Sequence, residues 1–503
     1  MLRNTSRVAI LVVIVGALLA LTNGFWEGKL LGLFSVLMSC SVIFIALVIS
    51  LENRKPAHTI AWLAVLGSFP IVGFLFYLLF GRNYWQQRRY KKKADFDEAV
   101  LLKFQEPSPI AVERLPMAPH QRPLLRLAYR IGQHPVSLAS QTAVLTNGEE
   151  TFSSIFAELE KAEHHIHLEY YIVRHDEIGQ QLKRVLMEKA RQGVRVRFLY
   201  DAVGSWKLSN DYIEELRAAG VEMIPFSPVR LPFLSNQINF RNHRKIIVID
   251  GSVGFVGGLN IGDEYLGKNE YFGFWRDTHL LIRGEAVRTL QLIFLQDWYY
   301  MTGERLLTPD YLSPPRIVEE GQGGVQLIAG GPDQKWEVIK QLYFAMITAA
   351  KRSIWVASPY FVPDEDILTA LKVAALSGID VRLLAPKRPD KKIVFYASRS
   401  YFPELLEAGV KIYEYERGFL HSKVIVVDGE LASIGTANMD MRSFHLNFEV
   451  NAFLYYTDSI HKLVRNFLED FRHASMIDYE QFQQRPFRVR IAESVSRLLS
   501  PLL

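Results

Sequence analysis

The first 80 residues and the rest of the chain differ in how apolar positions are arranged. Three apolar stretches, residues 8–22, 30–51 and 59–80, crowd the N-terminal part, whereas apolar and polar residues alternate in short runs afterwards. A helix crosses a bilayer with roughly 20 apolar residues, because each residue advances it by about 1.5 Å. The second and third stretches meet this length, although Pro70 interrupts the third. We therefore predict a membrane anchor with two or three spans within residues 1–95.

The first apolar stretch is the shortest of the three. It follows Arg3 and Arg7, and Phe25 with Trp26 could extend it as an aromatic anchor at the membrane surface. A charged start followed by a short apolar run is also the pattern of a signal peptide. A signal peptide needs a cleavage site with small residues after the run, and this sequence offers no clean one. The membrane span is therefore the favoured interpretation.

Basic residues flank the apolar stretches and indicate their orientation. Arg54 and Lys55 lie between the second and third stretches. A denser run follows the third stretch and consists of Arg82, Arg88, Arg89, Lys91, Lys92 and Lys93. Lysine and arginine accumulate on the cytoplasmic side of membrane spans, yet three full spans would place this run opposite Arg54. Either the first stretch does not cross, or the third is a re-entrant hairpin bent at Pro70.

We place the dense basic run, and the chain that follows it, on the cytoplasmic face of the cell membrane. The six cations of the run either bind anionic lipid headgroups or serve only as the flank of a span. In both cases the prediction is a multi-pass membrane protein whose larger part lies outside the bilayer.

Beyond residue 95 the chain contains the same order of elements twice. A polar linker with prolines, residues 96–130, leads to a first half at 131–315 and a second half at 325–503. Runs rich in β-branched and aromatic residues predict strands, and helical periodicity predicts the segments between them. In the first half the predicted elements are a strand at 162–173, a helix at 179–192, a strand at 194–200, a helix at 212–219 and a strand at 221–226. Their counterparts lie at 353–362, 367–376, 379–384, 401–408 and 410–415.

This alternation predicts an α/β fold with two repeats, each a mixed sheet flanked by helices, after a transmembrane helical anchor. The offset between the halves stays near 185 to 189 residues and then drops to 178, because the first half carries an extra loop at 227–240. The loop mixes apolar and basic residues. It is either an ordinary insertion or a lip that dips into the bilayer surface.

Composition excludes several classes of protein. Cys40 is the only cysteine and lies inside an apolar stretch, so one chain can form neither a disulfide framework nor a thiolate metal site. The net charge of +5 on 503 residues is modest and does not indicate a protein that binds nucleic acid over a broad surface. The chain does not reveal its oligomeric state.

Each half contains one copy of a motif in which histidine and lysine are two residues apart. The first copy is His243-x-Lys245 followed by Asp250, with Asn260 downstream, and the second has the corresponding residues His421, Lys423, Asp428 and Asn438. Residues two apart share one face of a strand, so histidine and lysine are predicted to point together. The Asp-Gly pair after each apolar run predicts a turn. Two such motifs at equivalent places are far rarer by chance than a single one.

An imidazole beside an ammonium suits phosphoryl transfer. A neutral imidazole can attack phosphorus and carry the group covalently. A second, protonated imidazole can donate to the leaving alkoxide while lysine neutralises the phosphate oxygens. One site then needs two histidines in opposite roles, and the duplication supplies one from each half. No metal or cofactor is required by this chemistry.

Other histidines are weaker candidates. His164, His165 and His167 invite a metal interpretation, but the sequence offers no further ligand type beside them, so we expect no metal site. His279 and His445 are interpreted as structural.

The motifs RNHRKIIVIDG, GFVGGLNIGDEYLG, FWRDTHL, SPYFVPD, HSKVIVVDG, TANMDMRSFHLNFEVNAF and SRLLSPLL resemble those of bacterial cardiolipin synthases in the phospholipase D superfamily. The likeness covers more than four fifths of the chain, and the first apolar stretch departs from it. The resemblance implies that His243 is the nucleophile and His421 the general acid and later base, although the symmetry of the motifs allows the reverse. It also implies that Lys245, Lys423, Asn260 and Asn438 hold the phosphate.

The carboxylates near the motifs are expected to have two different roles. Asp250 and Asp428 lie seven residues after their histidines, so we interpret them as fixing the turn. Asp277 and Glu449 occupy matching places in the two halves and are our candidates for orienting the histidines.

The resemblance implies a phosphatidyltransferase that joins two phosphatidylglycerol molecules into cardiolipin and glycerol through a phosphohistidine. Its partners would be phosphatidylglycerol and anionic membrane lipids, without nucleic acid. Two alternatives stay open: a phospholipase D-type hydrolase with water as acceptor, and a membrane scaffold that keeps the fold without the activity.

Overall fold

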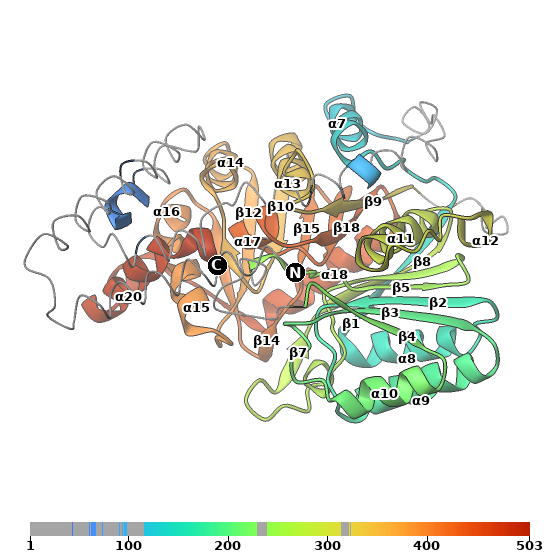
Figure 1. Cartoon of the computed structure of the whole chain (residues 1–503). Helices are drawn as coiled ribbons and strands as arrows, with labels where there is room; N and C mark the ends of the chain where they lie inside the picture. The colour runs from blue at the N-terminus through green and yellow to red at the C-terminus, as the bar shows by residue number, and fades with distance from the viewer. Residues whose placement is uncertain are drawn as a thin grey trace, which may run out of the picture. The chain divides into compact units, whose positions relative to one another are not determined.

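The computed structural model describes residues 115–228, 239–312, 321 and 323–503, with positions 43, 60, 62–66, 73, 90, 93 and 95–97 before them. Two compact units divide the chain, Met1–Tyr84 with Leu231–Asn236 and Trp85–Arg230 with Gln237–Leu503. Most of the predicted anchor and most of the extra loop lie outside the described residues. Within the described part, no helix is both long and apolar enough to cross a bilayer. The anchor therefore stays a prediction, and the second unit is described below (Figure 1).

The first half of this unit forms one mixed sheet of seven strands. Their order is β1-β8-β6-β5-β2-β3-β4. Strands β2, β3 and β4 are parallel neighbours, and all other neighbours are antiparallel. The strands are β1 (Ser140–Thr146), β2 (His165–Tyr170), β3 (Arg195–Asp201), β4 (Glu222–Phe226), β5 (Ile246–Ile249), β6 (Val253–Gly257) and β8 (Thr278–Gly284).

The second half repeats this arrangement. Its strand order is β9-β18-β16-β15-β10-β12-β13, and β19 is added beside β13 at the edge. Here β10, β12 and β13 are the parallel strands. The strands are β9 (Gly324–Gly330), β10 (Ser353–Ala357), β12 (Asp380–Pro386), β13 (Lys411–Tyr415), β15 (Val424–Val427), β16 (Leu431–Gly435), β18 (Glu449–Tyr455) and β19 (Ala474–Met476). The shared order confirms the predicted duplication and the mixed α/β sheets.

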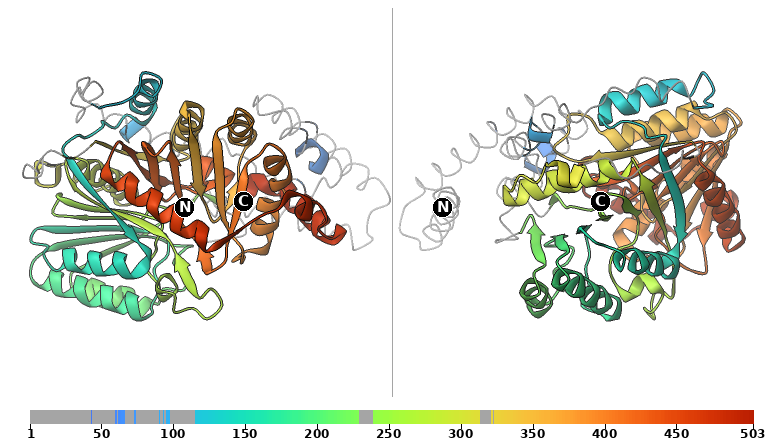
Figure 2. Two further views of the ribbon diagram at one scale, coloured as in Figure 1. Left: turned by 180° about the vertical axis from the view of Figure 1, so that it is seen from behind. Right: turned by 90° about the vertical axis from the view of Figure 1, so that its right-hand side faces the viewer.

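The two sheets pack face to face, with helices on both outer sides. Strand β5 shows why: Ile246 and Val248 join the core between the sheets, whereas Ile247 and Ile249 face the outer helices. The outer helices of the first sheet are α8 (Asn147–Leu159), α9 (Glu177–Arg191) and α10 (Asn210–Ala218). Those of the second are α7 (Arg122–Gly132), α13 (Val338–Ala349), α14 (Glu365–Leu376) and α16 (Phe402–Glu407). Figure 2 shows these two groups on opposite sides of the paired sheets in both views.

The remaining elements complete this frame. Helices α11 (Val287–Thr302) and α18 (Asp458–Arg472) contribute to the core between the sheets. Four short helices are α12 (Pro309–Leu312), α15 (Lys392–Arg399), α17 (Met441–His445) and α19 (Tyr479–Gln483), and α20 (Phe487–Leu498) lies near the C-terminus. The 3-10 turns are η2 (Asp263–Leu266) and η3 (Ser500–Leu502). Two small parallel pairs are β11 (Phe361–Val362) with β17 (Met439–Asp440), and β7 (Phe274–Arg276) with β14 (Gly418–Leu420).

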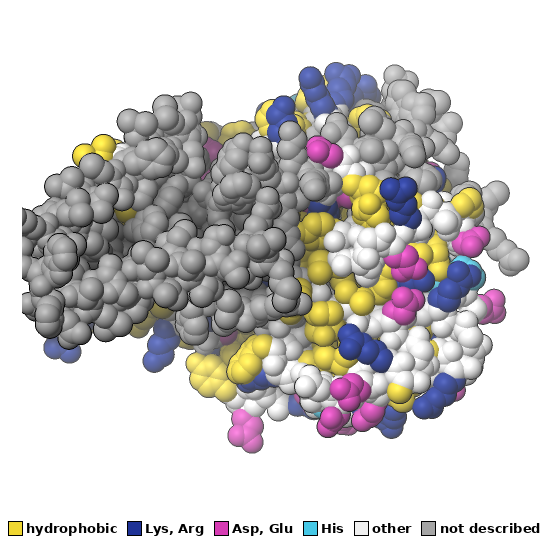
Figure 3. Space-filling model, in the orientation of Figure 1, with side chains coloured by type: hydrophobic (Ala, Val, Ile, Leu, Met, Phe, Trp, Pro, Cys, Tyr) yellow, Lys and Arg dark blue, Asp and Glu magenta, His cyan; other side chains and the backbone are white. Residues whose placement is uncertain are grey.

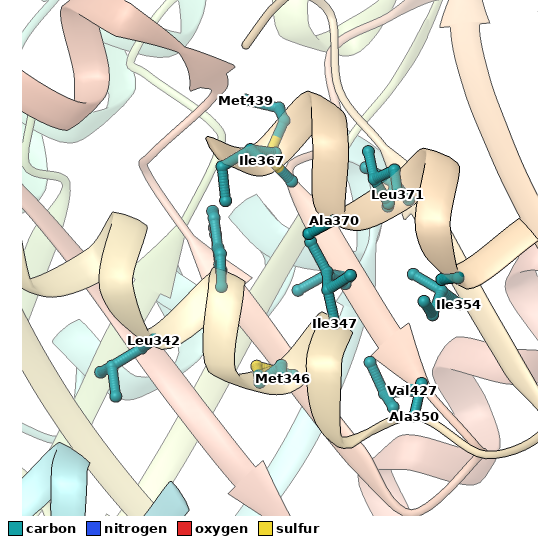
Figure 4. Packing of buried hydrophobic residues seen from close by; sticks show 14 of the residues in the cluster. Leu342, Met346, Ile347, Ala350, Ile354, Ile367, Ala370, Leu371, Val427 and Met439 are labelled. Carbon is teal, nitrogen blue, oxygen red and sulfur yellow. The ribbon is translucent and has the colours of Figure 1, made fainter. Parts of the chain in front are cut away.

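Figure 4 shows how the outer core of the second half is filled. Ile347 of α13 lies next to Ala370 of α14, and Leu342, Met346, Ile367 and Leu371 belong to the same buried cluster. Residues three and four apart share a helix face, which gives each helix one apolar side. The side chain of Asp364 accepts a hydrogen bond from the backbone nitrogen of Ile367 and so caps the start of α14.

Three features differ from the sequence prediction. The predicted strand 353–362 is broken into β10 and β11. The end of the predicted linker is helix α7, which packs on α13 because Leu124, Leu125 and Ala128 are apolar and buried. The histidine and lysine of each motif lie in extended segments before β5 and β15, outside the strands themselves.

Asp250 and Asp428 lie at equivalent turns, at the far ends of β5 and β15 from the histidines. Each carboxylate accepts three backbone N–H hydrogen bonds: Asp250 from residues 163–165 at 2.8 Å each, and Asp428 from residues 351–353 at 2.7 to 2.9 Å. Both residues adopt positive φ, of 52° and 57°. This geometry agrees with a turn-fixing role and ties each turn to the strand beside it.

Replacing Asp428 by alanine should lower the stability of the protein by about 1–3 kcal/mol, because three backbone donors lose their acceptor. Asp428→Asn should cost less, since one acceptor oxygen remains. Chemical denaturation of the two variants and of the exposed control Glu480→Ala measures the effect. An Asp428→Ala protein with the unfolding midpoint of the control would contradict the assignment.

Candidate functional site

The two histidine motifs lie together because the backbone segment that carries each histidine pairs with a segment of the other half. Strand β14 of the second half lies parallel to β7 of the first, and the backbone nitrogen of His421 donates to the carbonyl oxygen of Arg276 at 2.7 Å. In the mirrored arrangement, Asn242 pairs with Phe448, and the nitrogen of His243 donates to the Phe448 carbonyl oxygen at 2.9 Å. The two halves thus exchange pairing segments at the centre of the unit.

This exchange places a carboxylate from one half against the histidine of the other. Nδ1 of His243 lies 2.9 Å from Oε2 of Glu449, and Nδ1 of His421 lies 2.6 Å from Oδ2 of Asp277. An ionised carboxylate can only accept, so each imidazole donates from Nδ1 and keeps its lone pair on Nε2. Both carboxylates are fully buried. The sequence analysis proposed Asp277 and Glu449 as the carboxylates that orient the histidines. In the structure each carboxylate contacts the histidine of the other half.

The two lysines are held in the same way in both halves. Nζ of Lys245 donates to the carbonyl oxygen of His243, and Nζ of Lys423 to that of His421, both at 2.6 Å. Burial is the main cause that lowers the pKa of Lys245 to about 7 and that of Lys423 to about 8. The charge of Lys423 acts on Lys245, so the four groups form one electrostatic site. Burying these cations is costly, and an anion is the ligand that would offset the cost.

Both imidazoles are neutral near pH 7. Burial, the largest cause, and the adjacent lysines together lower the pKa of His243 and that of His421 to about 4. Glu449 opposes this effect on His243, and Asp277 opposes it on His421. A neutral imidazole with a free Nε2 is the form that acts as a nucleophile or a base.

The carboxylates themselves stay ionised. Burial alone would raise the pKa of Glu449, but His243 and Lys245 outweigh it and lower the value to about 2. Burial alone would also raise the pKa of Asp277, but its hydrogen bond to His421 and the charge of Lys423 lower this pKa below its usual value.

The predicted phosphate-binding asparagines differ in their surroundings. Asn260 already accepts from the backbone nitrogen of Ile172 at 3.0 Å and donates to the Tyr265 hydroxyl at 2.8 Å. The side-chain oxygen of Asn438 is buried and has no hydrogen-bond partner within the described residues. Both asparagines lie at the ends of the strands that follow the motif strands, so a role in binding phosphate stays a prediction for each.

Aromatic rings line the site on each side. The Tyr171 ring lies 5.0 Å from the His243 ring and 5.4 Å from Nζ of Lys245. The Trp275 ring lies 5.2 Å from the His421 ring. The sequence analysis did not identify these residues. Trp275 lies two positions before Asp277, and this closeness to a candidate site residue was the only feature of the sequence that could have identified it.

One glycine makes room for a catalytic carboxylate. A Cβ on Gly258 would lie 2.1 Å from Oδ1 of Asp277, so any larger residue would displace the partner of His421. The second half has Thr436 at the equivalent position, and its hydroxyl accepts from the backbone nitrogen of Val450 at 2.9 Å. The two halves therefore support their carboxylates differently.

The structure corrects the interpretation of Lys93 as part of an accessible basic run. Its side chain is buried, and Nζ lies 2.6 Å from Asp97, 3.1 Å from Asp297 and 2.9 Å from Asp333. Burial disfavours the charge, but the three carboxylates outweigh it and raise the pKa of Lys93 well above its ordinary value. Lys93 therefore cannot reach a lipid headgroup.

The Lys93 cluster also supports the catalytic segment. Asp297 forms an ion pair with Arg244, the residue between His243 and Lys245. Nε of Arg244 in turn donates to the carbonyl oxygen of Glu449 at 3.1 Å. A buried cation at the middle position of the motif was visible in the sequence, but its partners come from distant segments.

The other histidines lie away from the site or inside the core. His164, His165 and His167 lie at β2, where His165 and His167 contact Gln291. Among the described residues, no cluster of three or more His, Cys, Asp or Glu side chains could hold a metal ion. His445 pairs with Glu337 at 2.8 Å. The surface in Figure 3 shows Lys and Arg side chains interspersed with Asp and Glu over most of its described part.

Comparisons with known proteins agree with this geometry. A family model described as "Cardiolipin synthase, PLD-like domain" matches residues 155–298 and 343–471, and one described as "Phospholipase_D-nuclease N-terminal" matches residues 39–82. Proteins named cardiolipin synthase from Geobacillus kaustophilus and Geobacillus thermodenitrificans are 98% and 92% identical over 502 residues, covering both chains completely.

Among solved structures, a phosphatidylserine synthase from Haemophilus influenzae matches with a TM-score of 0.56. The match covers 76% of this chain and all of that one, at 14% sequence identity. At this identity the likeness concerns the fold alone.

Buried neutral histidines should make the protein sensitive to mild acid. Burial lowers the pKa to about 4 in His134, His165, His243, His279 and His421. An unfolded histidine titrates near 6.5. Between about pH 6.5 and pH 4 these histidines therefore bind more protons in the unfolded chain than in the folded one. The free energy of unfolding should fall as the pH falls through this range, and these histidines should change it little above pH 7.

Thermal unfolding at pH 7.5, 6.5 and 5.5 tests this expectation. His279→Leu should weaken the pH dependence, because it removes one histidine whose pKa is lowered in the folded chain. The substitution breaks no hydrogen bond of the described structure, since neither ring nitrogen of His279 has a partner there. An unfolding temperature that stays constant from pH 7.5 to pH 5.5 would rule out the buried neutral histidines.

Proposed function

Because the chain belongs to the cardiolipin synthase family with a phospholipase D-like domain, we propose that it transfers a phosphatidyl group from one phosphatidylglycerol to another. The products are cardiolipin and free glycerol. One observation carries the mechanism: two imidazoles from different halves, that of His421 buried and that of His243 mostly buried, are each fixed by a carboxylate of the other half. Two buried lysines lie near enough that their charges act on both imidazoles.

In the first step, Nε2 of His243 attacks the phosphorus of one phosphatidylglycerol. A nitrogen–phosphorus bond forms, the bond to the glycerol oxygen breaks, and protonated His421 gives that oxygen a proton. Lys245 and Lys423 neutralise the charge on the non-bridging oxygens. Glu449 holds the imidazole of His243 in the attacking orientation and stabilises its positive charge in the phosphohistidine.

In the second step, the terminal hydroxyl of another phosphatidylglycerol attacks the phosphohistidine. His421 now accepts the proton of that hydroxyl, and the nitrogen–phosphorus bond breaks. One phosphodiester replaces another, so the exchange needs neither a nucleotide nor a metal cofactor. The same reaction with water as acceptor would be a hydrolysis.

His421 has to become protonated when the substrate binds. Burial and the charge of Lys423 lower the pKa of His421 to about 4 and so keep this imidazole neutral. A bound phosphodiester anion raises the pKa of a nearby imidazole, because opposite charges favour protonation. Substrate binding would thus prepare the general acid.

Membrane attachment is part of the proposal. The apolar stretches within residues 1–95, and the family match at 39–82, support a multi-pass anchor with the catalytic unit on the cytoplasmic face. The substrate is then supplied from the bilayer that holds the enzyme. Anionic lipids are the partners that the remaining basic residues of the flank would meet.

Product analysis tests the reaction. The full chain in detergent micelles with acyl-labelled phosphatidylglycerol should release cardiolipin and glycerol in equal amounts. His243→Ala and His421→Ala should each lose about 10²-fold or more of this activity. Phosphatidic acid in place of cardiolipin would establish the hydrolase instead, and no lipid product from the wild-type chain would leave the scaffold interpretation. Full activity in both variants would contradict the two-histidine mechanism.

A substrate with a good leaving group tests the two histidine roles. Phosphatidyl-p-nitrophenol needs no proton donor, so His421→Ala should release a burst of p-nitrophenolate that matches the enzyme concentration and leaves the phosphatidyl group on His243. His243→Ala should give no burst.

Asp277→Asn serves as the matched control, because it weakens the partner of His421 and should keep the burst while slowing turnover of phosphatidylglycerol. Mass spectrometry of base-quenched peptides locates the adduct. An adduct on His421 in the His243→Ala protein would reverse the assignment.

A further inference from the structure

Helix α20 presents an apolar stripe to solvent. Phe487, Ile491, Val495 and Leu498 are exposed to 73%, 47%, 55% and 80%. Their spacing of four, four and three residues places them on one side of the helix. Isolated exposed apolar residues are common on protein surfaces, but a contiguous group of large ones marks a binding surface.

The charged residues of α20 also differ between its exposed and its buried side. Arg488 and Arg490 are exposed beside the stripe. Glu493 is the only acidic residue of the helix, and it is buried on the inner side, where it contacts Arg485 at 2.8 Å. The outer side of α20 is therefore apolar and cationic, with no carboxylate.

The neighbouring helix extends this surface. Helix α15 packs along α20, and both lie side by side at the end of the second half in Figures 1 and 2. At the start of α15, Ile393 is 51% exposed, and Arg388, Lys391 and Lys392 are exposed before and beside it. We call these positions the α15–α20 surface; its residues are Arg388, Lys391, Lys392, Ile393, Phe487, Arg488, Arg490, Ile491, Val495 and Leu498.

The segment before α15 links the α15–α20 surface to residues nearer the candidate site. Asp390 lies in the segment that leads into α15, and its carboxylate accepts a hydrogen bond from the Tyr360 hydroxyl. The charge of Asp390 acts on Lys423 in the site.

We propose that the α15–α20 surface rests on the bilayer, with its apolar side chains at the boundary of headgroups and acyl chains and its cations on anionic headgroups. An amphipathic helix with basic flanks and a hydrophobic stripe binds membranes in this way. Anionic lipid complements the surface because none of its five cations forms an ion pair with another described residue, and the nearby Asp390 carboxylate is bound to the Tyr360 hydroxyl. The contact is separate from the N-terminal apolar stretches and rests on the proposed function, in which the substrate lies in a bilayer.

A fluorescent probe on α20 tests the contact in the full chain. Leu498→Cys labelled with an environment-sensitive dye, in a Cys40→Ser background, is reconstituted into phosphatidylglycerol vesicles. We expect a blue-shifted emission that brominated lipid quenches by about half or more. Trp206→Cys is the matched control, since Trp206 is 71% exposed in the first half and should show neither effect.

Two results would overturn the proposal. Emission from position 498 as in water, without quenching by brominated lipid, would mean that α20 does not meet the bilayer. A shift that depends on protein density, with disulfide formation between two copies of an unlabelled Leu498→Cys protein, would assign the surface to a second copy of the chain.

Charge and activity give independent readouts. The double variant Arg488→Gln/Arg490→Gln should reduce the quenching in phosphatidylglycerol vesicles. Phe487→Gln/Leu498→Gln should lower kcat/KM on vesicles by at least about tenfold and leave turnover of a water-soluble, short-chain phosphatidylglycerol unchanged. Equal kcat/KM in variant and wild type on vesicles would also count against the proposal.

The probe measurement is repeated in His243→Ala, which lacks the proposed nucleophile. Quenching at position 498 should persist there, so a failure of the catalytic proposal and a failure of the membrane contact give different results.

Discussion

The structure depends on an exchange between its two halves: the histidine of each motif is held by a carboxylate that the other half supplies. Glu449 and Asp277 reach across because the segments around them pair with the segments that carry His243 and His421. The backbone bonds fix the position of each imidazole, and the carboxylate fixes its tautomer. The core between the two sheets keeps both pairs in register, so one continuous packing supports the whole site.

The same burial that orders the site also sets its charge. Two cations and two imidazoles are kept out of water, which lowers the pKa values of all four. The energetic cost is offset in part by Glu449 and Asp277, and a phosphodiester anion would offset the rest. In the proposed mechanism, a bound phosphodiester anion would make the same surroundings favour a protonated His421. Two similar imidazoles could then take the opposite roles proposed for them.

Much of the architecture could be predicted from the sequence. The alternation of strands and helices, repeated at a near-constant offset, predicted two mixed sheets, and both have the same strand order. The motif histidines, lysines and carboxylates were identified because their spacing recurs. The exchange between halves could not be predicted, since a repeated sequence is equally compatible with pairing inside each half. Lys93 was misassigned because two of its three carboxylate partners, Asp297 and Asp333, are distant in sequence, and the local pattern alone does not distinguish a buried lysine from one in a basic flank.

The crossed histidine–carboxylate pairs have a consequence for how such a chain can arise and change. A single repeat, cut away from its twin, would contain a histidine without its partner and a carboxylate without a ring to hold. It could work only by associating with another copy of itself, and fusion of two copies makes that association permanent. Once the genes are joined, each copy can drift independently, as Gly258 and Thr436 already have, provided that both ends of each pair persist.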